Sequence, residues 1–273
     1  MQGRGPERIM TLTIATWNVN SVRQRLDNIA RFVEAQAPDV LCLQEIKVRD
    51  EDFPAEALRG LGYEHQLVRG EKGYNGVAIL SRRPLAGQNA RSWCDKDDRR
   101  HASARLDGEI ELHNFYVPSG GPKPDRDANP KFDHKLSFLT EMADWAREEA
   151  IAERPLVLLG DLNVAPLETD VWNHKRLLRN VGHTPVESEH MARLLESGSF
   201  IDAERHFVPP EEPLFTWWGY RFAESFQRDY GWRLDHVWVT PPLAGALRSV
   251  TVFREARSWP QPSDHVPVIL TLG

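Results

Sequence analysis

The sequence has little cysteine and no long apolar run. Only two cysteines occur among 273 residues, which leaves no disulfide framework and no zinc site of cysteine spacing, so a reducing, cytoplasmic location is expected. No stretch approaches the roughly 18 apolar residues that a membrane span needs, so we expect no membrane partner. Residues 1–10 lack the apolar core of a signal peptide and are expected to form a flexible N-terminus.

The motifs of several enzyme classes are missing as well. Gly-x-Ser-x-Gly does not occur, and neither Cys42 nor Cys94 has a histidine at motif spacing, which disfavours a covalent serine or cysteine hydrolase. The glycine-containing stretch 70–76 lacks the helix that follows a phosphate-binding loop. The formal charge of −6 argues mildly against a passive nucleic-acid binder. An enzyme acting on DNA stays open, because local basic clusters such as residues 175–179 suffice.

Short β-type runs alternate with helical patterns along the chain. Apolar residues recur at helical spacing over residues 22–37 and 132–152. Strands are predicted at 12–16, 39–44, 76–81, 111–115, 156–159, 234–239 and 266–270. This mixture predicts an α/β protein with two packed sheets and helices outside. No linker rich in glycine, serine or proline divides the chain, so residues 11–273 are predicted to form a single domain.

Polar side chains stand where several of these strands end or begin. Taken singly, each is ordinary turn chemistry. Strands that share a sheet layer would, however, bring these side chains to one place, as functional sites require. The set comprises Asn18, Asn20, Glu45, Lys47, Tyr116, Asp161, Asn163, Asp235, Asp264 and His265.

The chemistry of this set favours phosphate-ester hydrolysis. Its carboxylates are hard oxygen ligands, which suit Mg²⁺ or Mn²⁺ and not zinc. Its amides fit around a phosphate without adding charge repulsion. Acidic ligands and a histidine without a covalent nucleophile indicate that water attacks the ester.

Six phrases of the sequence, in order, resemble the exonuclease III family of the endonuclease/exonuclease/phosphatase superfamily. They lie at residues 17–20, 43–47, 75–78, 160–163, 232–235 and 263–265, and the match extends from about residue 11 to 271. The resemblance implies a four-layered α/β sandwich, in which two packed mixed β-sheets are flanked by helices. It also implies a monomeric, Mg²⁺-dependent DNA-repair nuclease that cuts duplex DNA 5′ to abasic sites and from 3′ ends, with Mn²⁺ as a possible substitute.

The resemblance also implies roles for individual residues. Glu45 would be the main metal ligand, with Asn18 beside it and Asp264 near the metal. Asp161 would orient or deprotonate the attacking water, and Asn163 would position the phosphate. The remaining catalytic residues would be His265 as a donor to the phosphate, Asp235 as its orienting carboxylate and Tyr116 as a phenol aimed at the phosphate or leaving group.

Substrate contacts are implied by the same resemblance. Trp217, Trp232 and Leu234 would line a slot for a flipped, base-less sugar, although packing in the core is an equally strong interpretation. Apart from the resemblance, the basic residues Lys47, Arg23 and Arg221 are candidates for phosphate contacts. Two positions depart from well-known relatives: Ser119 replaces an amide side chain, and Asn20, also expected at the substrate, replaces an aspartate found in some of them.

Two alternatives remain open from the sequence. A phosphatase or phosphodiesterase acting on a small or lipid phosphate ester would share the catalytic set, because the superfamily contains such enzymes. A non-catalytic binding module would keep the fold but lose the chemistry, yet every matched catalytic position holds a competent residue. The balance of endonuclease and exonuclease activity and the number of metals depend on features that the sequence does not define.

Overall fold

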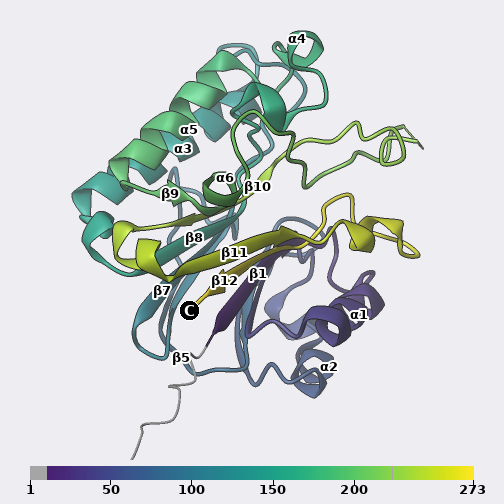
Figure 1. Cartoon of the computed structure of the whole chain (residues 1–273), viewed down its shortest axis with the longest axis vertical. Coiled ribbons are helices and arrows are strands. Elements are labelled where there is room, and N and C mark those ends of the chain that lie inside the picture. The colour runs from purple at the N-terminus through teal and green to yellow at the C-terminus, as the bar shows by residue number, and fades with distance from the viewer. Residues whose placement is uncertain (1–10, 223) are drawn as a thin grey trace, which may run out of the picture.

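The computed structural model describes residues 11–222 and 224–273, and the predicted N-terminal segment 1–10 lies outside them. Its strands form two six-stranded sheets (Figure 1). The first has the order β11-β12-β1-β2-β4-β3, with β1 Leu12–Asn18, β2 Val40–Gln44, β3 His65–Arg69, β4 Val77–Ser81, β11 Leu247–Val252 and β12 Val268–Leu272. The second has the order β5-β6-β7-β8-β10-β9, with β5 Leu85–Asn89, β6 His101–Leu106, β7 Ile110–Tyr116, β8 Leu156–Asp161, β9 Ile201–Asp202 and β10 Asp235–Val239.

Helices cover the outer face of each sheet, as Figure 1 shows. Helices α1 (Leu26–Gln36) and α2 (Ala55–Gly60) lie beside the first sheet, and α3 (Pro130–Glu148) and α5 (Pro185–Ser197) lie beside the second. Shorter helices are α4 (His174–Leu177) and α6 (Ala203–Phe207). Two packed mixed sheets with helices outside are the α/β sandwich that the resemblance implied, and that prediction is confirmed.

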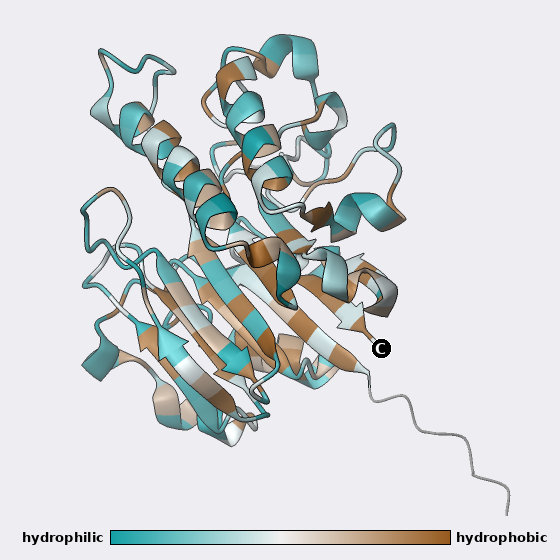
Figure 2. Ribbon diagram, turned by 90° about the vertical axis from the view of Figure 1, so that its left-hand side faces the viewer, coloured by the Kyte–Doolittle hydropathy of each residue, from teal (hydrophilic) through white to brown (hydrophobic). Residues whose placement is uncertain are grey.

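Three apolar layers hold the sandwich together. The middle layer fills the space between the sheets and includes Ile14, Cys42 and Leu159, all of them fully buried. The outer layers join the first sheet to α1 and α2 and the second sheet to α3 and α5. Figure 2 shows the corresponding alternation of apolar and polar residues along the strands. Among the helices of the described residues, none has both the length and the apolar character needed to cross a bilayer.

The two sheets repeat one pairing scheme, and this scheme brings the strand ends together. Strand β1 runs parallel to β2 and antiparallel to β12. Strand β8 runs parallel to β7 and antiparallel to β10. The carboxyl ends of β1, β2, β7 and β8 therefore meet the amino ends of β10 and β12 at one edge of the sandwich.

Candidate active site

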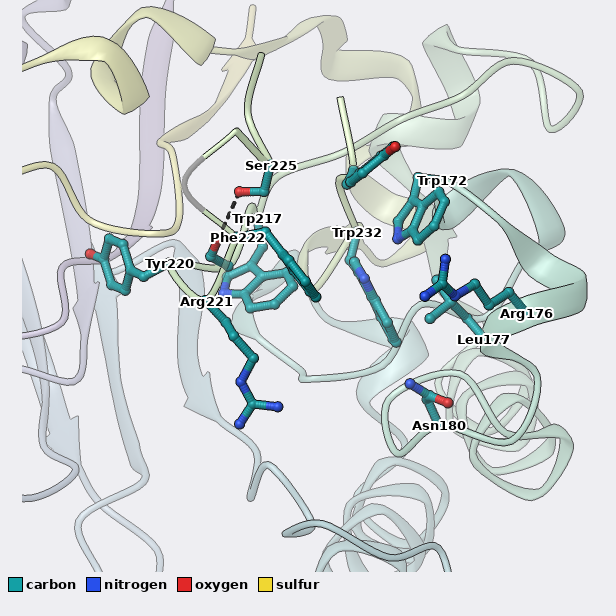
Figure 3. A pocket seen from close by; sticks show the side chains of 12 residues that line it. Trp172, Arg176, Leu177, Asn180, Trp217, Tyr220, Arg221, Phe222, Ser225 and Trp232 are labelled. Atoms are coloured by element: carbon teal, nitrogen blue, oxygen red, sulfur yellow. Dashed lines mark hydrogen bonds between the residues drawn. The ribbon is translucent and has the colours of Figure 1, made fainter. Parts of the chain in front are cut away.

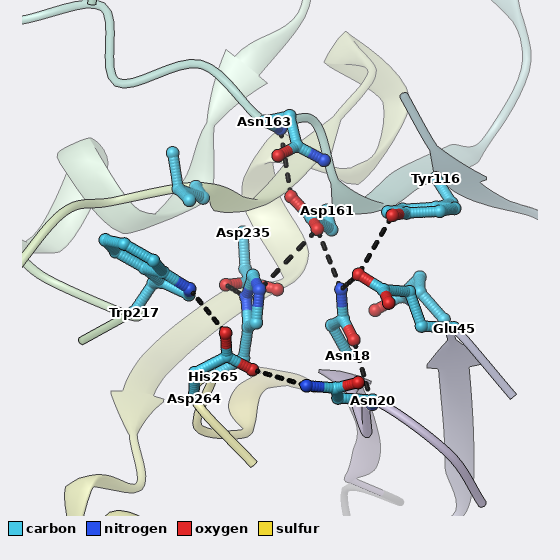
Figure 4. A network of polar contacts seen from close by, with 12 residues as sticks. Asn18, Asn20, Glu45, Tyr116, Asp161, Asn163, Trp217, Asp235, Asp264 and His265 are labelled. Atoms are coloured by element: carbon cyan, nitrogen blue, oxygen red, sulfur yellow. Dashed lines mark hydrogen bonds and ion pairs between the residues drawn. The ribbon is translucent and has the colours of Figure 1, made fainter. Parts of the chain in front are cut away.

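The predicted site residues from both sheets meet at this edge, in what we call the strand-end cluster: Asn18, Glu45, Asp161, Asp235 and His265 (Figure 4). Asn18 ends β1, and its amide nitrogen donates at 2.9 Å to Glu45 Oε1 and at 2.9 Å to Asp161 Oδ2. Asp161 ends β8 in register with Asp235 at the start of β10. One asparagine thus links a carboxylate of the first sheet to a carboxylate of the second.

A close approach of the backbone allows β8 to deliver Asp161. Gly160, the preceding residue, has φ 132° and packs so closely on β7 that a Cβ atom would lie 2.0 Å from the Phe115 carbonyl oxygen. Only glycine fits such a position without moving the neighbouring strand. The glycine of the Gly-Asp pair is therefore required by strand packing, and the aspartate that follows it is delivered to the site.

His265 is held by Asp235 at the bottom of the cluster. Its Nδ1 lies 2.8 Å from Asp235 Oδ2, and its Nε2 lies 3.7 Å from Asp161 Oδ2. The Thr216 hydroxyl donates to Asp235 Oδ2 at 2.7 Å, a contact that we did not predict although Thr216 precedes the noted Trp217. These contacts fix the imidazole with one nitrogen toward Asp235 and the other toward Asp161.

Burial and neighbouring charges set the protonation states of His265 and Asp161. Burial lowers the pKa of His265, but the carboxylates of Asp235 and Asp161 outweigh it and raise that pKa to about 10. Burial raises the pKa of Asp161 to about 7, against the opposing effect of His265. At neutral pH the imidazole is therefore a cationic donor beside a carboxyl group whose pKa lies close to neutrality.

Tyr116 joins the cluster from the end of β7. Its hydroxyl donates to Glu45 Oε1 at 2.9 Å. Burial, together with the charges of Glu45 and Asp161, raises its pKa well above the ordinary value of 10, so the phenol keeps its proton. Arg100, which we did not predict, lies 4.8 Å from the centre of the ring and donates to the Tyr116 carbonyl at 3.3 Å.

Oxygen atoms around Glu45 fit a divalent cation. Glu45 Oε2 and Asn20 Oδ1 both lie 2.6 Å from the Lys47 ammonium, which shows that these oxygens already stabilise a positive charge there. Burial opposes ionisation of Glu45, but Lys47 and the hydrogen bond from Asn18 prevail and lower its pKa. Its side chain keeps 18% exposure. An ionised, partly accessible carboxylate among neutral oxygens is a donor set of the kind that Mg²⁺ prefers.

A second group could also hold a cation. Ligand atoms of Asp161, Asp235 and His265 lie within 4.8 Å of one another. Asp235 Oδ1 has no hydrogen-bond partner among the described residues. His265 and Asp235 are, however, bonded to each other, so binding a metal there would break the contact that orients the imidazole. Glu45 is therefore the better anchor for a cation.

Two predicted residues make contacts of a different kind. Asp264 accepts from the Asn20 amide at 3.2 Å and from the Trp217 indole at 3.0 Å, so both its oxygens are engaged by side chains. The Asn163 amide donates to the Val117 carbonyl at 2.9 Å, while its backbone N–H donates to Asp161 Oδ1 at 2.9 Å. Their roles at a metal and a phosphate stay predictions.

Trp217, Trp232 and Leu234 line one small cavity, which we call the slot. Its volume is about 240 Å³, and Asn163 and Ser119 also line it. Gly182 forms part of its wall, where a Cβ atom would come within 3.1 Å of the Trp232 ring. The three apolar residues thus meet beside the strand-end cluster, whereas the neighbouring Trp218 is buried in the core.

An ion pair that the sequence did not reveal supports the slot. Lys135 on α3 and Glu187 on α5 are fully buried and in contact. Lys135 donates to the Asn163 carbonyl at 2.7 Å, and Glu187 accepts from the Gly182 N–H at 2.9 Å. In the sequence, Lys135 looks like an ordinary polar residue of an amphipathic helix, so no signal distinguishes it.

Residues 15–265 match the Endonuclease/Exonuclease/phosphatase family. The chain therefore belongs to this family and is a phosphodiester hydrolase of its exonuclease III type, as the sequence motifs had indicated. It is 31% identical to exodeoxyribonuclease III of Haemophilus influenzae over 93% of this chain and 97% of that protein.

Solved structures agree with this assignment. The 3′ phosphatase NExo from Neisseria, bound to a product DNA hairpin, superposes with a TM-score of 0.88 at 35% identity over 96% of this chain and 99% of that one. An AP endonuclease from Archaeoglobus fulgidus gives a TM-score of 0.88 at 33% identity, with the same shares of both chains covered.

Proposed function

We propose that this chain is a divalent-metal-dependent DNA-repair nuclease that hydrolyses duplex DNA 5′ to abasic sites and from 3′ ends. The observation that carries the proposal is the position of the slot directly beside the strand-end cluster, since Asn163 borders both. A base-less sugar is small enough for the slot, and it leaves the helix at little stacking cost. The relatives named above, which include an AP endonuclease, support the same substrate class.

The contacts suggest a division of labour in hydrolysis. Asp161 takes a proton from the attacking water, whose oxygen bonds to phosphorus while the bond from phosphorus to the leaving oxygen breaks. His265, oriented by Asp235 at 2.8 Å, donates to a non-bridging oxygen and stabilises its growing charge. The Tyr116 phenol, kept protonated by its surroundings, donates to the phosphate or the leaving oxygen.

Glu45 and Asn18 would hold the cation, with Asp264 nearby, and Mg²⁺ is the metal that we propose, with Mn²⁺ as a substitute. A bound divalent ion would neutralise phosphate charge and polarise the ester. We further propose that residues 11–273 form the single catalytic domain, with Lys47, Asn20 and Arg221 contacting DNA. The cytoplasmic location and the monomeric state remain predictions.

The nearest competing function is hydrolysis of a small or lipid phosphate ester on the same scaffold. The test compares cleavage of a duplex that carries one abasic analogue with hydrolysis of an inositol phosphate, both with Mg²⁺. The proposal predicts cleavage of the abasic strand and no comparable release of inorganic phosphate. The opposite preference would replace the nuclease assignment with a phosphatase, and activity on neither substrate would favour a non-catalytic binding module.

A further inference from the structure

A second and larger cavity adjoins the slot, and we call it the aromatic pocket (Figure 3). Its volume is about 690 Å³, within the range of ordinary ligand sites. It shares Asn180, Trp217 and Trp232 with the slot, so the two cavities are neighbours. The proposed function uses the slot and a DNA contact from Arg221, which leaves the aromatic walls of this larger space without a role.

The pocket is walled by aromatic rings. Six of its twelve lining residues are aromatic, namely Trp172, Trp217, Tyr220, Phe222, Tyr230 and Trp232. Trp172 and Tyr230 stack on each other with ring centres 4.2 Å apart. Phe222 is 65% exposed and Tyr220 46% exposed, although large apolar side chains are normally covered. Exposed aromatic faces around one cavity favour an occupant that is itself flat and apolar on its faces.

The charge around the pocket favours an anionic occupant. The chain as a whole is acidic, with a formal charge of −6. None of the twelve described residues that line the pocket is acidic, whereas Arg176 and Arg221 are basic. The Arg176 guanidinium lies 5.4 Å from the Trp172 ring centre, so one wall offers both a π-face and a positive charge. Bases stacked on aromatic rings with phosphates on nearby guanidiniums are the usual pattern of single-strand recognition.

We propose that the aromatic pocket binds the base of an unpaired nucleotide at the 3′ end of a DNA strand. The inference rests on the proposed nuclease function and adds a substrate class to it. A paired base is stacked inside the duplex and cannot reach these rings, whereas an unpaired base costs little to displace. A base-less sugar has nothing to fill the pocket. The enzyme would therefore bind frayed or mismatched 3′ ends more tightly than perfectly paired ones.

The test uses three duplexes that differ only in the 3′-terminal residue, which is paired, mismatched or a base-less sugar analogue. Tyr230→Leu removes a ring and keeps an apolar side chain, and Tyr230→Phe keeps the ring as the matched control. Tyr230→Leu should raise KM for the mismatched end about tenfold, because stacking of one base is worth about 1–3 kcal/mol. Cleavage of the base-less end by this variant, and all three reactions of Tyr230→Phe, should match the parent protein.

A second variant guards against loss of folding. Phe222→Ser changes a side chain that is 65% exposed, so it should raise KM for the mismatched end several-fold without altering the thermal unfolding midpoint. Equal effects of Tyr230→Leu on the mismatched and base-less ends, or no effect on either, would overturn the pocket as a base site. If the parent protein cleaved none of the three duplexes, the proposed nuclease function would fail, and the base site with it.

Discussion

Two ionic clusters that differ in their chemistry flank Leu234 along the chain, since Arg233 belongs to one and Asp235 to the other. On one side lies the strand-end cluster, in which carboxylates meet the His265 imidazole and a phenol. On the other side lies an arginine cluster, formed by Asp170, Asp202, Glu204, Arg205 and Arg233. Arg233 is 1% exposed, and it lies 2.9 Å from Asp170, 2.8 Å from Asp202 and 3.4 Å from Glu204.

The difference between the clusters is the group that carries the positive charge. A guanidinium does not lose its proton in a protein, so the cations of the arginine cluster are permanent and hold the chain that leads into β10, although burial raises the pKa of the Glu204 carboxyl well above its ordinary value. An imidazole and a carboxyl group can exchange protons, so the strand-end cluster can do chemistry. Because Arg233 and Asp235 are only two residues apart, the arginine cluster also holds this part of the strand-end cluster in place.

The largest effect on the cleavage rate should come from substitutions in the strand-end cluster. Asp161→Asn should lower the cleavage rate on abasic DNA by about 10²–10⁴-fold, because a positioned acid–base group is lost. His265→Ala should cost about 10²–10³-fold, because it removes a donor to the developing charge. The measurement is single-turnover cleavage, and DNA affinity in chelator should hardly change.

Asp202→Asn is the matched control, since it makes the same change in the arginine cluster. Its cleavage rate per folded molecule should stay near that of the parent protein. Near-normal turnover by Asp161→Asn or His265→Ala would show that the role of that residue is misassigned.

The next largest effect should appear in stability. Arg233→Met removes the main cation beside Asp202 and beside the buried carboxylates of Asp170 and Glu204, which should lower the free energy of unfolding by about 3–5 kcal/mol. Arg248→Met, at an exposed position, should stay within about 0.5 kcal/mol of the parent protein. Urea unfolding followed by circular dichroism measures both, and equal stability of the two variants would contradict the structural role of the arginine cluster.

A smaller effect, on the pH dependence of stability, should come from Glu111 and its neighbours on the second sheet. His113 at 3.6 Å and the guanidiniums of Arg105 and Arg154 overcome burial and lower the pKa of Glu111 to about 2. In the unfolded chain a glutamate side chain has a pKa of about 4.3. Because the pKa of Glu111 is lower in the folded protein, its carboxylate stabilises the fold above that pH. The stabilisation should disappear as the pH falls from about 4.3 to about 2.

Glu111→Gln tests this directly. Its unfolding free energy, measured from pH 6 to pH 2, should fall less steeply than that of the parent protein. Parallel curves for the two proteins would mean that Glu111 gains no stabilisation from its neighbours.

Most inner strands of the fold were predictable, and its edge strands were not. Predicted strands such as 156–159 correspond to buried strands of apolar composition. Of the missed strands, β3, β5, β9 and β11 are the edges of the two sheets, where polar residues are tolerated and the apolar signal is weak. The inner strand β6 was missed as well, because its sequence alternates small and polar residues and has only Leu106 as a large apolar side chain. Strand β12 begins two residues later than predicted, because Val266 instead donates its N–H to the Thr216 carbonyl.

The site was predictable where chemistry selects the residue type. Carboxylates at strand ends were recognisable, because few other side chains can bind a divalent cation or take a proton from an attacking water. Thr216, Arg100 and the Lys135–Glu187 pair act through contacts across 16 to 52 positions or through burial, which spacing along the chain does not encode. Asp264 is the instructive case, since its type suggested a metal ligand while both its oxygens accept from Asn20 and Trp217.

The central claim is that the strand-end cluster hydrolyses DNA with a divalent cation held at Glu45. The most direct measurement is cleavage of an abasic duplex by the parent protein and by Glu45→Gln, first in chelator and then during a titration with Mg²⁺. We expect no cleavage in chelator, full recovery of the parent protein on adding Mg²⁺, and a much higher Mg²⁺ requirement for Glu45→Gln with unchanged DNA affinity. Undiminished cleavage in chelator, or identical Mg²⁺ titrations of the two proteins, would contradict it.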